Sequence, residues 1–210
     1  MLRVGLTGGL ASGKSFVGNA LAELGCHVIR ADDLGHRVLL PGGEAYDAVV
    51  NEFGESILDD EGMIDRRRLG VIVFNNAERL QKLNAFVHPA VIHREMAMED
   101  EIGKRDPDGI AVVEAAILVE TGSYKRFQKL IVAACAPEQQ MERAMRRDSY
   151  TKEEALARVR RQLPLEEKIK LADYVIDTSG TKEQTLKQVR EVYESLRTLA
   201  LKQAAPPQSS

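Results

Sequence analysis

A glycine-rich loop near the start of the chain constrains the fold more than any other feature. It reads LTGGLASGKSF over residues 6–16, and it directly follows the apolar segment at residues 2–6. Four of its residues satisfy the pattern G-x-x-x-x-G-K-[ST], namely Gly8, Gly13, Lys14 and Ser15. The pattern requires a strand before the loop and a helix after it, which is typical of α/β proteins.

The composition of this loop suits the phosphates of a nucleotide. Glycine tolerates positive φ and has no side chain, so the turn can aim several backbone N–H groups at phosphate oxygens. Lys14 adds charge, the following helix adds its dipole, and Ser15 places a hydroxyl where it can ligate Mg²⁺. We therefore expect a nucleotide and Mg²⁺ as ligands. The expected nucleotide-binding residues are Gly8, Gly9, Ala11, Ser12, Gly13, Lys14, Ser15 and Phe16.

Apolar runs and helical patterns alternate along the chain. Five short runs are predicted to be buried strands, at Leu2 to Leu6, His27 to Arg30, Ile110 to Glu114, Leu130 to Ala134 and Tyr174 to Asp177. The alternation predicts an α/β fold, with a five-stranded parallel sheet that is flanked by helices. The helical patterns lie at Ser15 to Leu24, Ala45 to Phe53, Arg66 to Phe74, Glu78 to Ile102 and Thr181 to Lys202, with two more after Pro137 and Thr151.

We expect one domain over residues 1–204. Three helices before the third strand exceed what one crossover needs, so residues of about 41–105 are predicted to form an inserted helical subdomain. The arginine-bearing helices at about 138–171 are predicted to form a lid. The sheet core would then comprise about 1–40, 106–137 and 172–204, and the tail at 205–210 is expected to be flexible.

Composition and charge exclude several classes of protein. The formal net charge of -3 gives no overall basic field for nucleic acid or an anionic membrane. No apolar run reaches the roughly 18 residues of a membrane span, and no secretory signal is present, so we expect a cytoplasmic protein. Cys26 and Cys135 lie singly in apolar surroundings, which predicts buried thiols. Oligomeric state is left open, because no heptad or isolated apolar stripe marks an interface.

Switch GTPases, ATP-driven machines and small-molecule kinases all share such a loop. The guanine-reading N-K-x-D is absent from the sequence, and the D-x-x-G at residues 32–35 is short enough to be accidental. The VVEAA segment with Glu114 is a partial match to the magnesium-binding strand of ATPases. A kinase instead needs a carboxylate to take up the acceptor proton, and arginines that neutralise the transferred phosphoryl group.

The chain offers both features. Asp32 and Asp33 follow the second strand, whose carboxyl end faces the ligand crevice in an open parallel sheet. We favour Asp32 as the functional carboxylate and Asp33 as a helix cap or solvated neighbour. Arg143 and Arg147 are four residues apart and share one helix face, which suits a lid over phosphates. The second half of the lid would contribute Arg158, Arg160, Arg161 and Gln162. A solvated charged face is the alternative interpretation of these arginines.

Six motifs follow one another in the chain order of a known family. They read GLTGGLASGKS, VIRADDLGHRVL, NAFVHPAV, ILVETGSYK, MRRDSYTKEEALARVRRQ and ADYVIDTSG. Over nearly the whole chain, this series resembles the dephospho-CoA kinase family. The resemblance implies a P-loop kinase-like three-layer fold and transfer of the γ-phosphate of ATP, with Mg²⁺, to the ribose 3′-hydroxyl of dephospho-CoA. This reaction is the last step of coenzyme A synthesis.

The resemblance also implies roles for single residues. Asp32 matches the second aspartate of the family's D-A-D and would be the general base. Arg143 and Arg147 match lid positions. Arg66 matches the D-R-x-x-L of the subdomain that binds the acceptor, and His88 matches an H-P pair. For His88, packing is an alternative to substrate contact.

Three positions depart from the family pattern. Arg30 replaces the first aspartate of D-A-D, Ala116 replaces a proline, and Thr178 replaces an asparagine. None of these changes affects Lys14 or Asp32. Two other functions remain open at this stage: another P-loop small-molecule or nucleotide kinase, and a non-enzymatic ATP-binding module.

Overall fold

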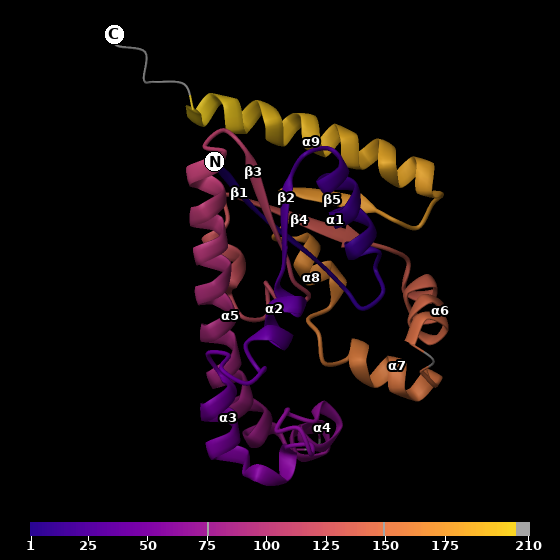
Figure 1. The fold of residues 1–210 in the computed structure, drawn as a ribbon. Coiled ribbons are helices and arrows are strands. Elements are labelled where there is room, and N and C mark those ends of the chain that lie inside the picture. The colour runs from indigo at the N-terminus through magenta and orange to yellow at the C-terminus, as the bar shows by residue number, and fades with distance from the viewer. Residues whose placement is uncertain (75, 149, 205–210) are drawn as a thin grey trace. The chain divides into compact units, whose positions relative to one another are not determined.

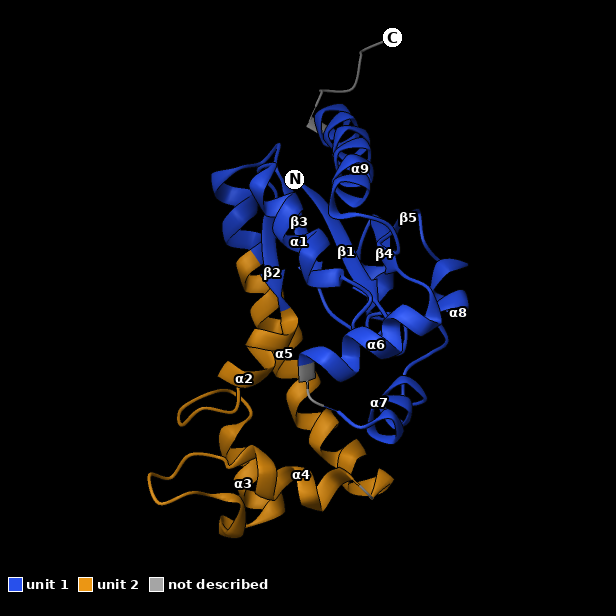
Figure 2. Cartoon of the chain, turned by 90° about the vertical axis from the view of Figure 1, so that its right-hand side faces the viewer, with its two compact units in different colours: residues 1–30, 99–210 blue, residues 31–98 orange. Residues whose placement is uncertain are grey.

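The chain divides into two compact units. The computed structural model describes residues 1–74, 76–148 and 150–204. One unit comprises residues 1–30 and 99–210, and the other comprises residues 31–98 (Figure 2). The tail at 205–210 lies outside the described residues. The predicted division into a core, a subdomain at about 41–105 and a lid stays a prediction.

The first unit is built on a parallel sheet of five strands, as the sequence predicted (Figure 1). The strands are β1 (Leu2–Gly8), β2 (His27–Arg30), β3 (Ile110–Glu114), β4 (Lys129–Ala134) and β5 (Tyr174–Asp177). Their order in the sheet is β2-β3-β1-β4-β5, so that β1 is central. Leu6 lies opposite Glu114 on β3 and Ile131 on β4. The sheet order reverses at β1, and in such folds ligands bind at the carboxyl ends of the strands near this point.

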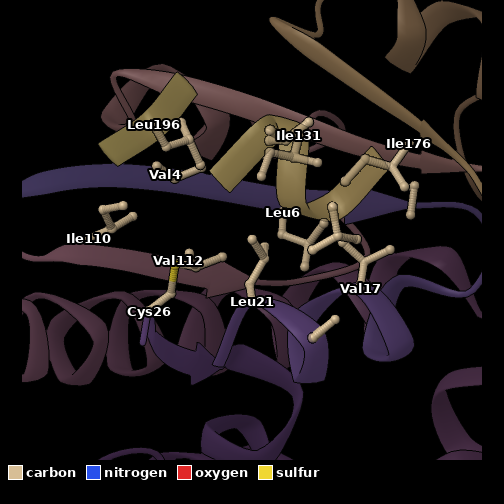
Figure 3. Packing of buried hydrophobic residues seen from close by; sticks show 14 of the residues in the cluster. Val4, Leu6, Val17, Leu21, Cys26, Ile110, Val112, Ile131, Ile176 and Leu196 are labelled. Atoms are coloured by element: carbon tan, nitrogen blue, oxygen red, sulfur yellow. The ribbon is translucent and has the colours of Figure 1, made fainter. Parts of the chain in front are cut away.

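One face of the sheet is covered by α1 (Lys14–Glu23) and α9 (Lys182–Ala204). Alternate residues of β1 point into this layer, where they meet apolar side chains of both helices (Figure 3). Val17 and Leu21 come from α1, and Val189 and Leu196 come from α9. Cys26 is buried in the same cluster. The helical pattern predicted at Thr181 to Lys202 is therefore a helix that packs on the sheet.

The opposite face of the sheet is also closely packed. A Cβ built on Gly5 of β1 would lie 2.8 Å from Cδ2 of Phe127 and 3.1 Å from Cδ1 of Leu118. On this side, the chain after β3 contains a short 3₁₀ helix, η2 (Ser123–Arg126). Because both faces are buried, the strands carry nearly continuous apolar sequence.

Between β4 and β5, the described residues form three helices. They are α6 (Pro137–Asp148), α7 (Lys152–Val159) and α8 (Leu165–Ile169). Pro137 is the first residue of α6, where its missing N–H costs nothing. Thr151 caps α7: its side chain accepts from the Glu154 N–H, while the Glu154 side chain accepts from the Thr151 N–H. The two helix starts predicted from sequence are thus confirmed.

The second unit is helical. It contains α2 (Ala31–Arg37), α3 (Tyr46–Phe53), the 3₁₀ helix η1 (Glu55–Ile57), α4 (Arg66–Phe74) and most of α5 (Ala77–Arg105). Its helices share an apolar cluster of their own, which includes Val38, Val49, Phe53, Ile57, Leu69 and Val73. At the surface, Glu52 pairs with Arg79 at 3.0 Å and with Lys82 at 2.9 Å.

The sequence prediction was wrong about the chain after β2. Helix α2 begins at Ala31, directly after the last residue of the strand, whereas the cap interpretation of Asp33 requires a helix that begins after it. Asp32 and Asp33 therefore lie within its first turn, and neither is the residue that precedes the helix as a cap. Asp33 is exposed, in keeping with the alternative of a solvated neighbour. In the described part of the chain, no helix is long and apolar enough to cross a membrane.

Candidate active site

The glycine-rich loop connects the central strand to α1. Its backbone bends through two residues with positive φ, Ala11 at 55° and Gly13 at 83°. The Ser12 N–H donates to the Gly9 carbonyl at 3.2 Å, which closes the turn. Gly13 precedes α1 as its N-cap and contributes no side-chain hydrogen bond. The N–H groups of the first turn are then available to an anion, and the helix dipole favours negative charge there.

Close contacts explain why glycines occupy this loop. A Cβ on Gly8 would lie 2.3 Å from Ser12 Oγ and 2.6 Å from the Ala133 carbonyl oxygen. A Cβ on Gly13 would lie 3.0 Å from Thr178 Oγ1, and the positive φ of Gly13 adds strain for any other residue. The loop is thus formed against the ends of β4 and β5.

Lys14 and Ser15 converge on a buried carboxylate. Lys14 Nζ lies 2.7 Å from Oε1 of Glu114, and Ser15 Oγ donates to the same oxygen at 2.7 Å. Arg30 Nε lies 3.6 Å from the other oxygen, Oε2. Glu114 is only 2% exposed, and two neighbouring cations offset the cost of burying its charge.

Glu114 was set aside at the sequence level as a partial match. The available signal was a charged residue at the end of a strand whose other residues are all apolar. Parallel pairing then places Glu114 directly opposite Arg30 of β2, the residue that departs from the family's D-A-D. The structure therefore pairs this unusual arginine with a carboxylate.

The residues present fit a magnesium ion that is shared with a nucleotide. Oε2 of Glu114 is buried and accepts no hydrogen bond from the described residues. Ser15 supplies a hydroxyl beside it, and Mg²⁺ prefers such oxygen ligands. Within the described ranges, no cluster of three or more His, Cys, Asp or Glu side chains could hold a metal ion. Mg²⁺ usually binds through one or two protein oxygens together with substrate phosphates, which suits this sparse set.

Arg143 of α6 reaches the phosphate loop through Thr178. Its guanidinium donates to Thr178 Oγ1 at 3.1 Å and to the Thr178 carbonyl at 2.8 Å. Thr178 Oγ1 lies 2.8 Å from the Ser12 carbonyl and 3.1 Å from that of Ala134, so it can donate to either one. The structure thus brings Arg143 beside the loop. Thr178 links the loop to the ends of β4 and β5, and sequence reasoning missed this role.

The other predicted lid residues lie in several settings. Arg147 lies one turn beyond Arg143 on α6 and is exposed. The Arg158 guanidinium lies 4.4 Å from the centre of the Tyr150 ring. Gln162 reaches the phosphate loop, where its Oε1 accepts from the Leu10 N–H at 2.8 Å. Arg160 and Arg161 are exposed.

The remaining predicted residues, Asp32, Arg66 and His88, belong to the helical unit. Asp32 is the second residue of α2, two positions beyond the end of β2. Arg66 begins α4, and the preceding Asp65 accepts from the N–H groups of Arg67 and Arg68 at 2.8 and 3.2 Å.

Two ionisable groups of this unit have shifted pKa values. The backbone N–H groups of Arg68 and Arg67 lower the pKa of Asp65 and favour its charged, helix-capping form. His88 lies on α5, where partial burial lowers its pKa below 6.5. His88 is therefore neutral at pH 7, in which form one ring nitrogen can accept a hydrogen bond.

The sheet order and the loop at its central strand define a nucleotide-binding P-loop protein of the α/β class. A family model described as dephospho-CoA kinase matches residues 2–184. The chain therefore belongs to the dephospho-CoA kinase family, which confirms the prediction from its motifs.

Individual relatives agree with this membership. A dephospho-CoA kinase of Aquifex aeolicus is 45% identical over 197 residues, which cover 93% of this chain and 98% of the relative. One from Geobacillus kaustophilus is 45% identical over 188 residues, covering 90% and 93%. Among solved structures, dephospho-CoA kinase from Campylobacter jejuni matches with a TM-score of 0.70 and 29% identity, covering 93% of this chain and 97% of that one. A Thermus thermophilus protein matches with a TM-score of 0.78 and 32% identity, covering 92% and 96%.

Proposed function

We propose that this chain transfers the γ-phosphate of ATP to the ribose 3′-hydroxyl of 3′-dephospho-CoA, giving CoA and ADP. The observation that carries the proposal is the family match over residues 2–184, within which the phosphate loop is complete. The acceptor is a small molecule, and we propose no nucleic-acid or membrane partner. A cytoplasmic location fits a reaction between dissolved metabolites.

The phosphate loop would hold the β- and γ-phosphates of ATP. Its backbone N–H groups and the first turn of α1 face negative charge, and Lys14 adds a full positive charge. Lys14 and Ser15 both contact Glu114, so binding of the nucleotide would shift both side chains from the carboxylate toward the phosphates. Ser15 Oγ, with Glu114 behind it, would hold Mg²⁺, which neutralises charge on the phosphates when it is bound.

Asp32 would act as the general base. A carboxylate beside the acceptor orients the 3′-hydroxyl and accepts its proton as the bond to phosphorus forms. Asp32 follows the end of β2 by two residues in sequence, and α/β proteins bind ligands near the carboxyl ends of such strands.

The arginines of α6 would stabilise the phosphoryl group while it is transferred. Arg143 already lies beside the loop through its two bonds to Thr178, and Arg147 lies one turn further along the helix. Charge on the three oxygens of the moving phosphoryl group favours such cations. A lid that carries them would also exclude water, which competes as an acceptor. In the helical unit, Arg66 and His88 are the proposed contacts to the acceptor.

The proposal is tested by acceptor-dependent release of ADP. Purified protein is given ATP and Mg²⁺ with dephospho-CoA, nucleoside monophosphates or shikimate in parallel reactions. We expect rapid ADP release only with dephospho-CoA, and phosphorus NMR of the product should show a new 3′-phosphate. Turnover with a different acceptor would assign another kinase activity. ATP binding without turnover on any of them would indicate a nucleotide-binding module.

A further inference from the structure

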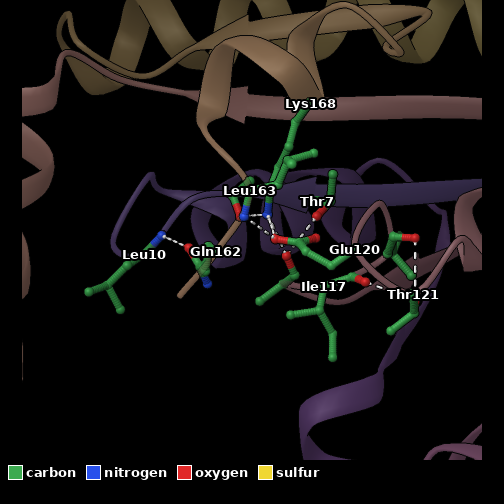
Figure 4. Close-up of polar contacts among 11 residues, drawn as sticks. Thr7, Leu10, Ile117, Glu120, Thr121, Gln162, Leu163 and Lys168 are labelled. Carbon is green, nitrogen blue, oxygen red and sulfur yellow. Dashed lines mark hydrogen bonds and ion pairs between the residues drawn. The ribbon is translucent and has the colours of Figure 1, made fainter. Parts of the chain in front are cut away.

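Lys168 of α8 is a charged side chain with 0% exposure. Its ammonium group lies among three oxygens (Figure 4): Glu120 Oε1 at 2.7 Å, the Ala116 carbonyl at 2.8 Å and the Gly8 carbonyl at 3.4 Å. An ammonium has three N–H donors, so each can point to an acceptor. Burial of this charge is tolerable because it is paired and hydrogen-bonded. Gly8 is the first glycine of the phosphate loop, so the Lys168–Glu120 ion pair lies next to this loop.

Glu120 also holds the last part of the predicted lid. Its Oε1 accepts from the Leu163 N–H at 3.0 Å, so one carboxylate oxygen joins Leu163 to Lys168 (Figure 4). The neighbouring Gln162 binds the phosphate loop directly through the Leu10 N–H at 2.8 Å. The segment 162–168 therefore contacts the loop at a backbone donor, Leu10, and at a backbone acceptor, Gly8.

This segment follows the predicted lid helix α7 and is far from the phosphate loop in sequence. Residues 162–168 begin three positions after the end of α7, the second helix of the predicted lid. Gln162 and Leu10 are 152 residues apart in sequence, so only the folded chain brings them together. A loop that must keep its N–H groups aimed at phosphates depends on such fixed points, because its own glycines impose little constraint.

We propose that Gln162, Glu120 and Lys168 form a clasp that sets the conformation of the phosphate loop and anchors the end of the lid to it. These three are positioning residues, since they act on the nucleotide through the backbone of Gly8 and Leu10. The inference rests on the proposed function only in taking ATP and ADP as the ligands of the loop.

The first test removes the bond from Gln162 to the loop. Gln162→Leu has a similar volume and no acceptor oxygen for the Leu10 N–H. The probe is a fluorescent ADP analogue, which needs no acceptor substrate. Loss of one hydrogen bond should weaken its binding by about two- to tenfold in Gln162→Leu. The KM for ATP should rise in parallel, with the KM for dephospho-CoA and the melting temperature little changed.

A matched control exists at the other end of the same strand. There, Gln128 Oε1 accepts from the Arg3 N–H at 2.7 Å, the same kind of bond at the amino end of β1. Gln128→Leu should leave binding of the ADP analogue unchanged. Unchanged binding in Gln162→Leu, or equal weakening in Gln128→Leu, would overturn the proposal. Failure of the chain to phosphorylate dephospho-CoA would not affect this result.

The second test asks whether the clasp acts as one unit. Glu120→Gln removes the charge beside Lys168 and keeps an oxygen for the Leu163 N–H, so it is milder than removal of the buried lysine. Glu120→Gln should also weaken binding of the ADP analogue. In a double-mutant cycle with Gln162→Leu, residues of one network should show non-additive effects on that affinity. Additive effects would show that the two contacts act separately, and the clasp as proposed would be wrong.

Discussion

The phosphate loop and the helical unit of residues 31–98 position their functional side chains by different means. Around the loop, the contacts join residues that are far apart in sequence: 166 positions for Thr178 and Ser12, and 100 for Glu114 and Lys14. At Arg66 in the helical unit, the contacts are local: Asp65 caps the helix that begins with Arg66. The loop is thus held by Glu114 of β3 and by Thr178 after β5, whereas the proposed acceptor residues belong to helices that share one apolar cluster. Substitutions in the two regions should therefore affect different substrates.

The largest expected effect comes from Asp32→Asn, which keeps the shape of the side chain and removes the base. The kcat should fall by about 10²–10⁴-fold, the usual contribution of a general base, while the KM for ATP stays nearly constant. Steady-state kinetics with dephospho-CoA and ATP measure both. Asp33→Asn, in the same helical turn, is the control and should retain most activity. A near wild-type kcat for Asp32→Asn would remove the base assignment.

The next effect comes from the apolar cluster of the helical unit. Phe53 is 8% exposed there, so Phe53→Ala should reduce the free energy of unfolding by about 3–5 kcal/mol. The KM for dephospho-CoA should rise, and binding of nucleotide to the loop should change much less. Chemical denaturation and the two KM values test this, with Leu40→Ala, an exposed position in the same unit, as the control. An equal loss of nucleotide affinity would erase the distinction between the two regions.

A smaller effect is expected where the loop meets β5. Thr178→Val keeps the volume of the side chain but removes the hydroxyl that bridges Arg143 and the Ser12 carbonyl. Leaving buried polar groups without this partner should cost about 1–3 kcal/mol in stability and raise the KM for ATP. Thr178→Ser retains the hydroxyl and should behave almost like the wild type. If dephospho-CoA rather than ATP were bound more weakly by Thr178→Val, the residue would belong to the acceptor side.

The smallest effect concerns His88 and pH. Burial lowers its pKa below 6.5, the value expected in the unfolded chain, so acid protonates the unfolded state first. The stability that neutral His88 contributes is present above pH 6.5 and is lost as pH falls through its lower folded pKa. Between pH 8 and 5.5, thermal melts of wild type should therefore lose more stability than those of His88→Gln. Parallel pH dependences of the two proteins would show that His88 does not contribute in this way.

The sequence predicted the sheet well because its signals are local. Each strand is a short apolar run, and the glycine pattern fixed where the first one ends and α1 begins. It failed at α2, because this seven-residue helix starts at Ala31 with no turn residue after the strand. A helix this short has no periodicity to reveal it.

The candidate site was predictable only in part. The loop, Lys14 and Arg143 could be found because motif spacing and helical spacing place them. The contacts of Glu114, Thr178 and Lys168 could not, since each depends on which strands are neighbours in the sheet. Glu114 gave a usable signal as a charge at the end of an apolar strand, whereas Lys168 lies in the ordinary polar sequence LEEKI and gave none.

Because Cys26 is buried in the sheet core, the reactivity of its thiol reports on unfolding. Burial raises the pKa of this thiol to about 12, and burial likewise raises that of Cys135, so neither side chain is a ready nucleophile while the sheet is closed. These are the two cysteines of the sequence, and both lie outside residues 31–98. The rate of reaction with a thiol reagent at pH 8 therefore counts openings of the unit that carries the phosphate loop, and a bound nucleotide should slow this reaction.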